Sequence, residues 1–262
     1  MNLPKDQILK GCKNPEGIAI LLKQAEQVLN TYQPSWSLFV SAPLREEALR
    51  ILKPLNELRF LTAGGHPQAE RHRILCERSC EEKNFLFQDP PLLGIVIEGN
   101  FLFDKPSTIE LRESINSKGI KLDSIGDIWI NNDRFAYAIC TPEAAKEING
   151  KRTKLRDIVI HFESVTLDQI KFPFERSPKV FSTIEASLRI DAIASAGFGI
   201  SRAKISRHIK EGHLRLNWEP IKTCSKVVKI GDSINHKEKG TIKIQQLYLT
   251  KRQRWRVELL RT

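Results

Sequence analysis

Cysteine is scarce in this chain, and long apolar runs are absent. The five cysteines among 262 residues are irregularly spaced, which excludes a disulfide framework and fits a reducing compartment. The longest apolar run, PLLGIVI, has the length of a strand and is too short to span a membrane. The first residues, MNLPKDQILKG, lack the apolar core of a secretion signal and the arginine- and serine-rich pattern of a transit peptide. We therefore expect a cytoplasmic protein without membrane insertion.

The chain also lacks the signatures that catalysis requires. No glycine-rich cofactor loop follows a strand pattern, and no nucleophile has an evident base. The synthetase-type signatures His-Ile-Gly-His and Lys-Met-Ser-Lys-Ser are missing as well. These absences argue against an enzyme, and we predict no catalytic residue and no cofactor.

A zinc site is the one metal centre that the sequence suggests. Its candidate ligands are His66, His72, Cys76 and Cys80. Zinc ligands usually come in tighter pairs, and no second pair follows here. Packed thiols explain the two cysteines better, so we predict no bound metal.

Positive charge is concentrated at one end of the chain. The formal net charge is +11, and residues 181–262 contain 17 lysines and arginines against 7 aspartates and glutamates, a balance of +10. The first 180 residues contain 25 against 24. A nearly neutral body joined to a basic module indicates an acidic partner, and nucleic acid is the most common one.

Periodicity predicts an α+β fold in four parts. Helical spacing in residues 4–30 and in PLREEALRIL indicates an N-terminal helical segment, residues 1–58. Strand and helix patterns then alternate, and they predict an RNA-recognition-motif-like (ferredoxin-like) middle domain, residues 59–165. Its strands include LLGIVIEG, GDIWI, FAYAIC and KLRDIVIHFESV, and its helices are TIELRESINSKG and one capped by Thr141. Two prolines and little periodicity indicate a linker at residues 166–181.

The C-terminal part, residues 182–262, reads as two short helices followed by a small sheet. The first helix is expected to stop at Gly197, and Ser201 is a good N-cap for the second. Gly212 ends the second helix, HLRLN begins a strand, and Gly231-Asp232 makes a later turn.

The second helix has the composition of a phosphate-binding surface. A helix N-terminus offers free amides and a partial positive charge, and both favour phosphate. Arg202 and Lys204 next to that end would add charge-assisted contacts, and Arg207 and Lys210 also face solvent or a ligand. The alternative is that these cations form an ordinary solvated face.

The segment LRIDAIASAGFGISRAKISRHIKEGHLRLN, followed by VVKIGDSI, closely resembles the S-four (αL) RNA-binding domain. The matching elements are the Arg-x-Asp pair, the Ser-Arg-x-Lys run, the turn from Gly212 to Asn217, and Gly231-Asp232. We expect Asp191 to pair with Arg189 or to cap local amides, not to act as an acid or base. The RNA contacts predicted in this module are Arg189, Ser201, Arg202, Lys204, Arg207, Lys210, Asn217, Trp218, Lys237 and Lys239.

One residue departs from that family. Many of its members have glycine where this chain has Trp218. Asn-Gly forms a left-handed turn easily, so we expect Asn-Trp to require a different local geometry. Trp218 either stacks on an exposed base or packs over the sheet edge.

Together with this module, GGHPQAERHR (residues 64–73) and IGDIWI (residues 125–130) resemble the YlmH family, and more narrowly its photosystem II S-four branch from photosynthetic lineages. Bacterial relatives bind the large ribosomal subunit carrying stalled peptidyl-tRNA and assist quality control. The resemblance therefore implies structured RNA (rRNA or tRNA) on the ribosome as partner, and we expect a monomer. Arg71 and Arg73 are further candidate RNA contacts, or ordinary surface charges of a hairpin.

Three functions follow from these observations. The favoured one is a non-catalytic RNA-binding protein of the ribosome or its large subunit, in translation quality control or photosystem II biogenesis. The alternatives are an RNA-modifying enzyme, such as a pseudouridine synthase or a methyltransferase, and a protein-interaction factor for photosystem assembly.

Overall fold

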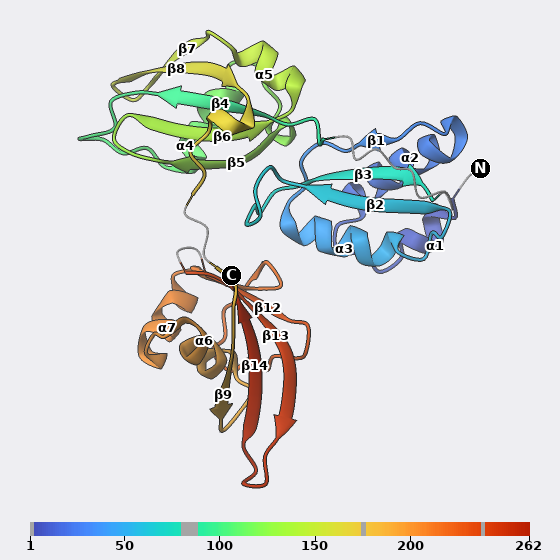
Figure 1. Cartoon of the computed structure of the whole chain (residues 1–262), viewed down its shortest axis with the longest axis vertical. Coiled ribbons are helices and arrows are strands. Elements are labelled where there is room, and N and C mark those ends of the chain that lie inside the picture. The colour runs from blue at the N-terminus through green and yellow to red at the C-terminus, as the bar shows by residue number, and fades with distance from the viewer. Residues whose placement is uncertain (1–2, 80–88, 174–176, 237–238) are drawn as a thin grey trace. The chain divides into compact units, whose positions relative to one another are not determined.

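The computed structural model describes residues 3–79, 89–173, 177–236 and 239–262. The chain divides into two compact units, residues 1–175 and 176–262, and each has a hydrophobic core of its own (Figure 1). The division lies inside the predicted linker. Among the described residues, no helix is both long enough and apolar enough to cross a membrane.

The first part of unit 1 combines three helices with a three-stranded antiparallel sheet of order β1-β3-β2. These elements are α1 (Lys5–Leu9), α2 (Pro15–Thr31), β1 (Ser35–Trp36), α3 (Ala42–Leu52), β2 (Leu58–Ala63) and β3 (Arg73–Arg78). The Asn14 side chain caps α2 by accepting from the Gly17 amide, and the apolar stripe of α2 is buried. The predicted helices are confirmed. Strands β2 and β3, however, pair with β1 of this part and not with the middle sheet, so the predicted division after residue 58 separates strands of one sheet.

The second part of unit 1 has a five-stranded antiparallel sheet of order β5-β6-β4-β8-β7. Its elements are β4 (Leu93–Glu98), α4 (Thr108–Asn116), η1 (Leu122–Ser124), β5 (Ile125–Ile130), β6 (Phe135–Cys140), α5 (Pro142–Ile148), β7 (Arg152–Leu155), β8 (Ile158–Val165) and η2 (Leu167–Gln169). The order of β5, β6, β4 and β8, with α4 after β4 and α5 after β6, is that of a ferredoxin-like fold, as predicted. The segment predicted as one strand, KLRDIVIHFESV, forms the β7–β8 hairpin, with Arg156 in a left-handed conformation at its turn.

One face of the five-stranded sheet is covered, and the other is covered in part. One face packs on α4 and α5 around residues such as Ile97 and Phe162. On the other face, Tyr137 and Ile139 are 6% and 0% exposed, and Ile139 packs with Phe39 from the first part of the unit. An RNA-recognition motif binds RNA by stacking bases on this second face. Here its part around Tyr137 and Ile139 is buried, while Val159 on β8 is 57% exposed.

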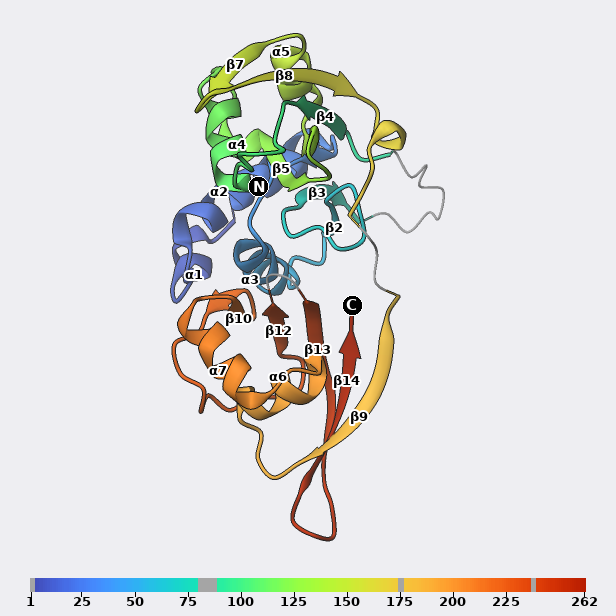
Figure 2. The same cartoon turned by 90° about the vertical axis from the view of Figure 1, so that its left-hand side faces the viewer.

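Unit 2 has a six-stranded antiparallel sheet of order β11-β10-β12-β13-β14-β9, with two helices on one face. Its elements are β9 (Lys179–Glu185), α6 (Ile190–Phe198), α7 (Arg202–Lys210), β10 (Leu214–Leu216), β11 (Glu219–Pro220), β12 (Ser233–His236), β13 (Gly240–Leu249) and β14 (Trp255–Arg261). The β13–β14 hairpin extends past both helices (Figures 1 and 2).

Helix α6 continues through Gly197, contrary to the prediction that it stops there. It ends at Gly199, which has the left-handed φ of +67° that a helix C-cap requires. A Cβ at position 197 would lie 2.3 Å from the Ile242 Cδ1 atom. Glycine at 197 therefore permits close packing of α6 on β13.

Candidate nucleic-acid interface

Two arginines and one aspartate form an ion-pair cluster where α6 begins. Arg189 donates from Nε and a terminal nitrogen to the two carboxylate oxygens of Asp191, at 3.1 and 3.2 Å. Arg202, the first residue of α7, donates to Asp191 Oδ2 at 2.9 Å. The Asp191 side chain is 7% exposed, while those of Arg189 and Arg202 are 42% and 56% exposed. A buried carboxylate therefore holds two guanidinium groups at the surface.

The protonation states of this cluster suit binding and not proton transfer. Burial opposes ionisation of Asp191, but hydrogen bonds from Arg189 and Arg202 outweigh it and lower the pKa of Asp191. Hydrogen bonds to Asp191 raise the pKa of Arg189. Asp191 also accepts from the Ala192 amide at 3.0 Å. The interpretation of Asp191 as a partner of Arg189 is confirmed.

Helix α7 begins as predicted and exposes its cations. The Ser201 hydroxyl accepts from the Lys204 amide at 3.3 Å. Ile205 and Ile209 are buried, whereas Arg202, Lys204, Arg207 and Lys210 are exposed. Within the described part of the chain, the ammonium groups of Lys204 and Lys210 make no ion pair. Arg207 lies 3.9 Å from Glu211, a distant i, i+4 pair that leaves its guanidinium accessible.

The Asn217-Trp218 turn has the left-handed geometry that we did not expect for it. Both residues have left-handed φ values, 52° and 67°, in the two-residue turn between β10 and β11. The Asn217 amide group donates to Asp232 Oδ1 and accepts from the Ser233 amide, both at 2.8 Å. These two bonds fix the Asn217 side chain in the turn, and its predicted RNA contact stays a prediction. Trp218 is half-buried, and a bulky residue at φ near +67° is strained.

The two remaining predicted contacts of the module lie in the turn between β12 and β13. Lys237 is outside the described residues. Lys239 is half-buried, and its amide donates to the His236 carbonyl.

Arg71 and Arg73 lie inside unit 1, which contradicts their predicted role as RNA contacts. Arg73 is 7% exposed, and it donates to the carbonyls of Ser37 and Pro91, each at 2.7 Å. Arg71 donates to the carbonyls of Ile125 and Phe39. These guanidinium groups join chain segments of unit 1, so they are not available to phosphate.

The two motifs behind the YlmH resemblance meet at Asp127. Its carboxylate accepts from the amides of Glu70 and Arg71, at 2.6 and 3.0 Å, and lies 3.6 Å from His66. Burial opposes its ionisation, but His66 and the two amides outweigh burial and lower the pKa of Asp127. Arg112 donates to the carbonyls of Ile125 and Gly126 on the same strand. The GGHPQAERHR and IGDIWI segments therefore form a structural joint.

The zinc candidates do not form a ligand set among the described residues. Cys76 is buried, and burial raises its pKa to about 12, so it remains a thiol. Cys80 is outside the described residues. A different group, His208, Glu211 and His213, has ligand atoms within 4.8 Å of one another, although the Nδ1 of His208 is also 2.8 Å from His236 Nε2. That the protein binds no metal stays a prediction.

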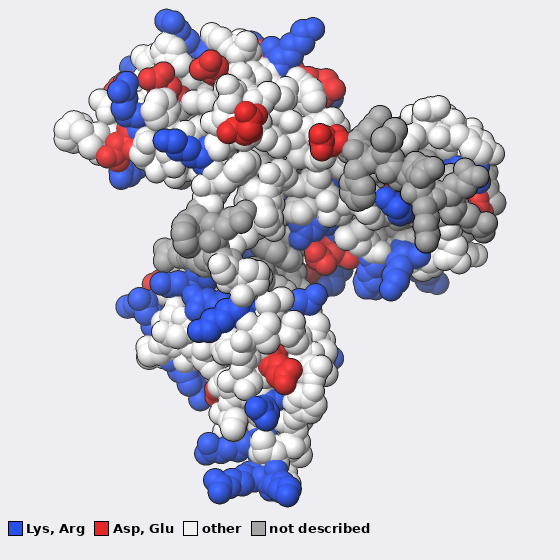
Figure 3. All heavy atoms as spheres, in the orientation of Figure 1, with Lys and Arg blue, Asp and Glu red and all other residues white. Residues whose placement is uncertain are grey.

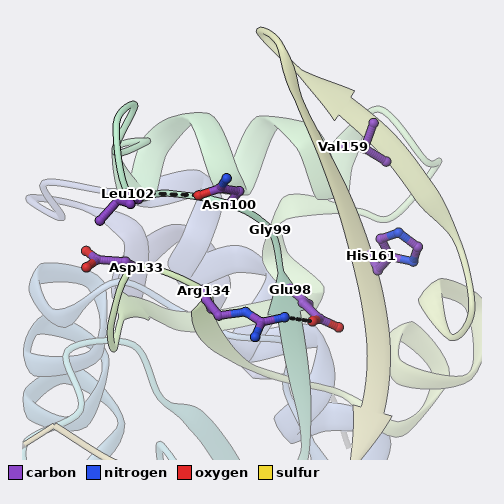
Figure 4. A pocket seen from close by; sticks show the side chains of 8 residues that line it. All are labelled: Glu98, Gly99, Asn100, Leu102, Asp133, Arg134, Val159 and His161. Carbon is purple, nitrogen blue, oxygen red and sulfur yellow. Dashed lines mark hydrogen bonds and ion pairs between the residues drawn. The ribbon is translucent and has the colours of Figure 1, made fainter.

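A hollow of about 540 Å³ lies on the second part of unit 1 (Figure 4). It is lined by Glu98, Gly99, Asn100, Leu102, Asp133, Arg134, Val159 and His161. Arg134 pairs with Glu98, and Asp133 pairs with Lys105. Its charged groups thus neutralise one another at an exposed surface, an arrangement that points to no particular ligand.

A second group of exposed cations, which we did not predict, lies on the β13–β14 hairpin. Lys251, Arg252, Arg254 and Arg256 are exposed and lie within six consecutive residues. The signal that would have found them is the absence of aspartate and glutamate from Lys239 to Val257.

Comparisons with known proteins match both ends of the chain. The family model for the YlmH N-terminal domain matches residues 13–79, which span α2 to β3, and the S4 domain model matches residues 188–234. The chain is 24% identical over 199 residues to the ribosome-associated protein quality control protein P2 of Bacillus subtilis (strain 168), covering 74% of this chain and 75% of the relative. The solved cell division protein YlmH from Streptococcus pneumoniae aligns at 15% identity and a TM-score of 0.47, over 62% of this chain and 96% of that one. The predicted resemblance to YlmH and S4 proteins is confirmed, since a YlmH N-terminal domain and an S4 domain are matched in the predicted order. The narrower photosystem II branch stays a prediction.

Proposed function

We propose that this protein is a non-catalytic RNA-binding protein that associates with the ribosome and binds structured RNA through its S4 domain. The observation that carries the proposal is the row of exposed cations on α7, beside two arginines that Asp191 holds at the surface. Cations fixed before binding lose less conformational entropy when they contact phosphate. The N-terminus of α7 adds free amides and a partial positive charge.

The ribosome as partner is supported by the relative from Bacillus subtilis, whose name describes a ribosome-associated quality control protein. Ribosomal RNA of the large subunit, or tRNA held on it, is the finer form of this proposal. The setting would then be translation quality control in the cytoplasm.

A salt titration with structured ribosomal RNA tests the proposal. Replacing Arg202 and Lys204 by alanine removes two exposed cations and leaves Asp191 paired with Arg189. Affinity should fall by about tenfold to a hundredfold, and the slope of log affinity against log salt should flatten by about one unit per phosphate contact. The loss should be similar across RNA sequences, since phosphate contacts carry no base preference.

The matched control is Lys23→Ala/Lys53→Ala, which removes two exposed cations from unit 1. This variant should bind like the unmodified protein. The control should melt like the unmodified protein, because exposed cations contribute little to stability. The α7 variant should melt somewhat lower, because Asp191 loses its hydrogen bond from Arg202, so binding is measured well below its melting temperature. Equal affinity and equal salt slope in the α7 variant would reduce these cations to a solvated face.

Two alternative functions remain predictions. An RNA-modifying activity would require a modification that disappears from ribosomal RNA in a deletion strain and returns with the purified protein. The link to photosystem II biogenesis rests on sequence motifs alone, and loss of the gene without a photosystem defect in a photosynthetic host would remove it.

A further inference from the structure

The free end of the β13–β14 hairpin is a second cationic surface of unit 2. Four cations, Lys251, Arg252, Arg254 and Arg256, are exposed there, and lysine and arginine side chains dominate this end in Figure 3. Among the described residues, none of the four makes an ion pair or a side-chain hydrogen bond. No acidic residue occurs between Lys239 and Val257 to neutralise them. Within the described part of the chain, no ion pair neutralises the charge of this surface.

The turn that presents these cations has a defined geometry. The Thr250 amide donates to the Arg254 carbonyl at 2.7 Å, and the Gln253 amide donates to the Thr250 carbonyl at 3.0 Å. The Arg254 amide donates to the Thr250 hydroxyl at 3.1 Å. Gln253 has a left-handed φ of 55°, as in a three-residue hairpin loop closed by a bulge. The backbone under the cations is thus internally bonded.

The sheet face next to the tip adds an aromatic side chain to the charge. Arg256 pairs across the strands with Tyr248 on one side and Ile184 on the other. These three side chains point away from the core, because their neighbours Val257 and Leu247 face α6. Tyr248 is 48% exposed. An exposed tyrosine beside cations is a surface on which a nucleic-acid base can stack.

The tip is separate from the cations of α7. Strand β13 has ten residues, so the turn at Thr250 lies roughly 30 Å from the start of the strand. The start of β13 pairs with β12, whose His236 contacts His208 of α7. The S4 domain match ends at residue 234, before the hairpin begins. The hairpin therefore lies outside the matched residues, and it extends away from α7 (Figure 2).

We propose that the β13–β14 tip is a second phosphate-binding site for the same structured RNA, so that unit 2 contacts its RNA at two places. This inference takes its partner, structured RNA, from the proposed function. Arg252 and Arg254 donate to phosphate oxygens, and Lys251 adds a third positive charge. Two contacts at separate places on unit 2 select a long RNA over a short one, because only a partner that spans both places reaches both.

The test compares three full-length variants for binding to a structured ribosomal RNA fragment at several salt concentrations. In the tip variant, Lys251, Arg252 and Arg254 are replaced by alanine. The control variant Lys23→Ala/Lys53→Ala/Lys121→Ala removes the same charge from exposed positions of unit 1. The third variant is Arg202→Ala/Lys204→Ala. We expect the tip variant to lose about tenfold or more in affinity and about two to three units of salt slope, with the control unchanged.

The length of the RNA separates this inference from the proposed function. The tip variant should lose affinity for the long fragment but not for a stem-loop too short to reach both sites, whereas the α7 variant should lose affinity for both. If the tip variant binds the long RNA like the control, the second site is wrong and the proposed function stands. If the unmodified protein does not bind structured RNA above the level of the control polyanion heparin, both fail.

A membrane surface is the other anionic partner to be tested. Vesicles that contain phosphatidylserine serve as the probe, against vesicles of phosphatidylcholine alone. The inference requires that the tip variant lose affinity for RNA, whatever its affinity for vesicles. A tip variant that loses only vesicle binding would overturn it.

Discussion

The two large sheets of this protein differ in what covers them. The five-stranded sheet of unit 1 has the strand order of an RNA-recognition motif, yet one face and the part of the other around Tyr137 and Ile139 are buried by the unit's own segments. The six-stranded sheet of unit 2 has helices on one face, and its other face exposes Ile184, Tyr248 and Arg256. Strand order therefore does not indicate where RNA binds in this protein. Exposure and positive charge indicate the RNA-binding surface better, and both favour unit 2.

Arginine has a different role in each unit. In unit 1, Arg71 and Arg73 donate to backbone carbonyls and hold segments together. In unit 2, Arg189 and Arg202 are held at the surface by a buried carboxylate. The same side chain acts as an internal joint in a neutral unit and as a surface donor in a basic one.

The largest expected effect comes from separating the two units. Residues 177–262 form a compact unit with its own core, so this fragment should fold and bind structured ribosomal RNA within about threefold of the full chain. Residues 1–173 should bind about a thousandfold more weakly, as a protein without specific phosphate contacts does. Fluorescence anisotropy with one RNA and one buffer measures both. Equal affinities of the two fragments would show that the two units do not differ in RNA binding.

Asp127→Asn tests the joint inside unit 1. The substitution keeps the shape of the side chain but removes the charge that faces Arg71 and His66. We expect a loss of about 3 kcal/mol in the free energy of unfolding, because the nitrogen of the Asn side chain cannot accept from the Glu70 or Arg71 amide and leaves a buried donor unsatisfied. RNA affinity of the folded protein should not change. The control, Asp157→Asn at a fully exposed side chain, should cost less than about 0.5 kcal/mol.

Acid should destabilise unit 1 through the same carboxylate. The pKa of Asp127 is lower in the folded protein than its ordinary 3.8. Its stabilising contribution is therefore complete above the ordinary pKa and is lost as the pH falls through the folded pKa. Denaturant midpoints of residues 1–173 should decline over this range. In Asp127→Asn the decline should be shallower, and an identical decline would show that other carboxylates cause it.

The smallest effect concerns the strained turn of unit 2. Trp218→Gly and Trp218→Ala both remove the indole, but only glycine adopts a left-handed φ without a Cβ clash. The glycine variant should therefore be more stable than the alanine variant by about 1 kcal/mol. If the indole stacks on a base, both variants should lose RNA affinity by about 1–3 kcal/mol. Unchanged affinity would leave Trp218 with a packing role over the sheet edge.

Several features of the fold were predictable because they depend on near neighbours in the chain. The Ser201 and Thr141 caps each bond an amide three residues on. The strands of the five-stranded sheet follow local alternation and turn residues, and the excess of positive charge after residue 180 needs only counting. The placement of Arg71 and the errors at the Asn217-Trp218 turn and at Gly197 have another origin. Each depends on a partner far away in the sequence: the Ile125 carbonyl, Asp232 and Ile242, respectively.

The sequence alone determined the local elements, the basic C-terminal module and the resemblance to S4 and YlmH proteins, because period, caps and charge act over a few residues. Only the tertiary structure decided which cations reach solvent. It buried Arg73, placed Arg189 and Arg202 around Asp191, and covered Tyr137 and Ile139 on the five-stranded sheet. The physical reason is that exposure depends on segments distant in the chain that pack against a residue, and residue type and spacing do not record which segments those are.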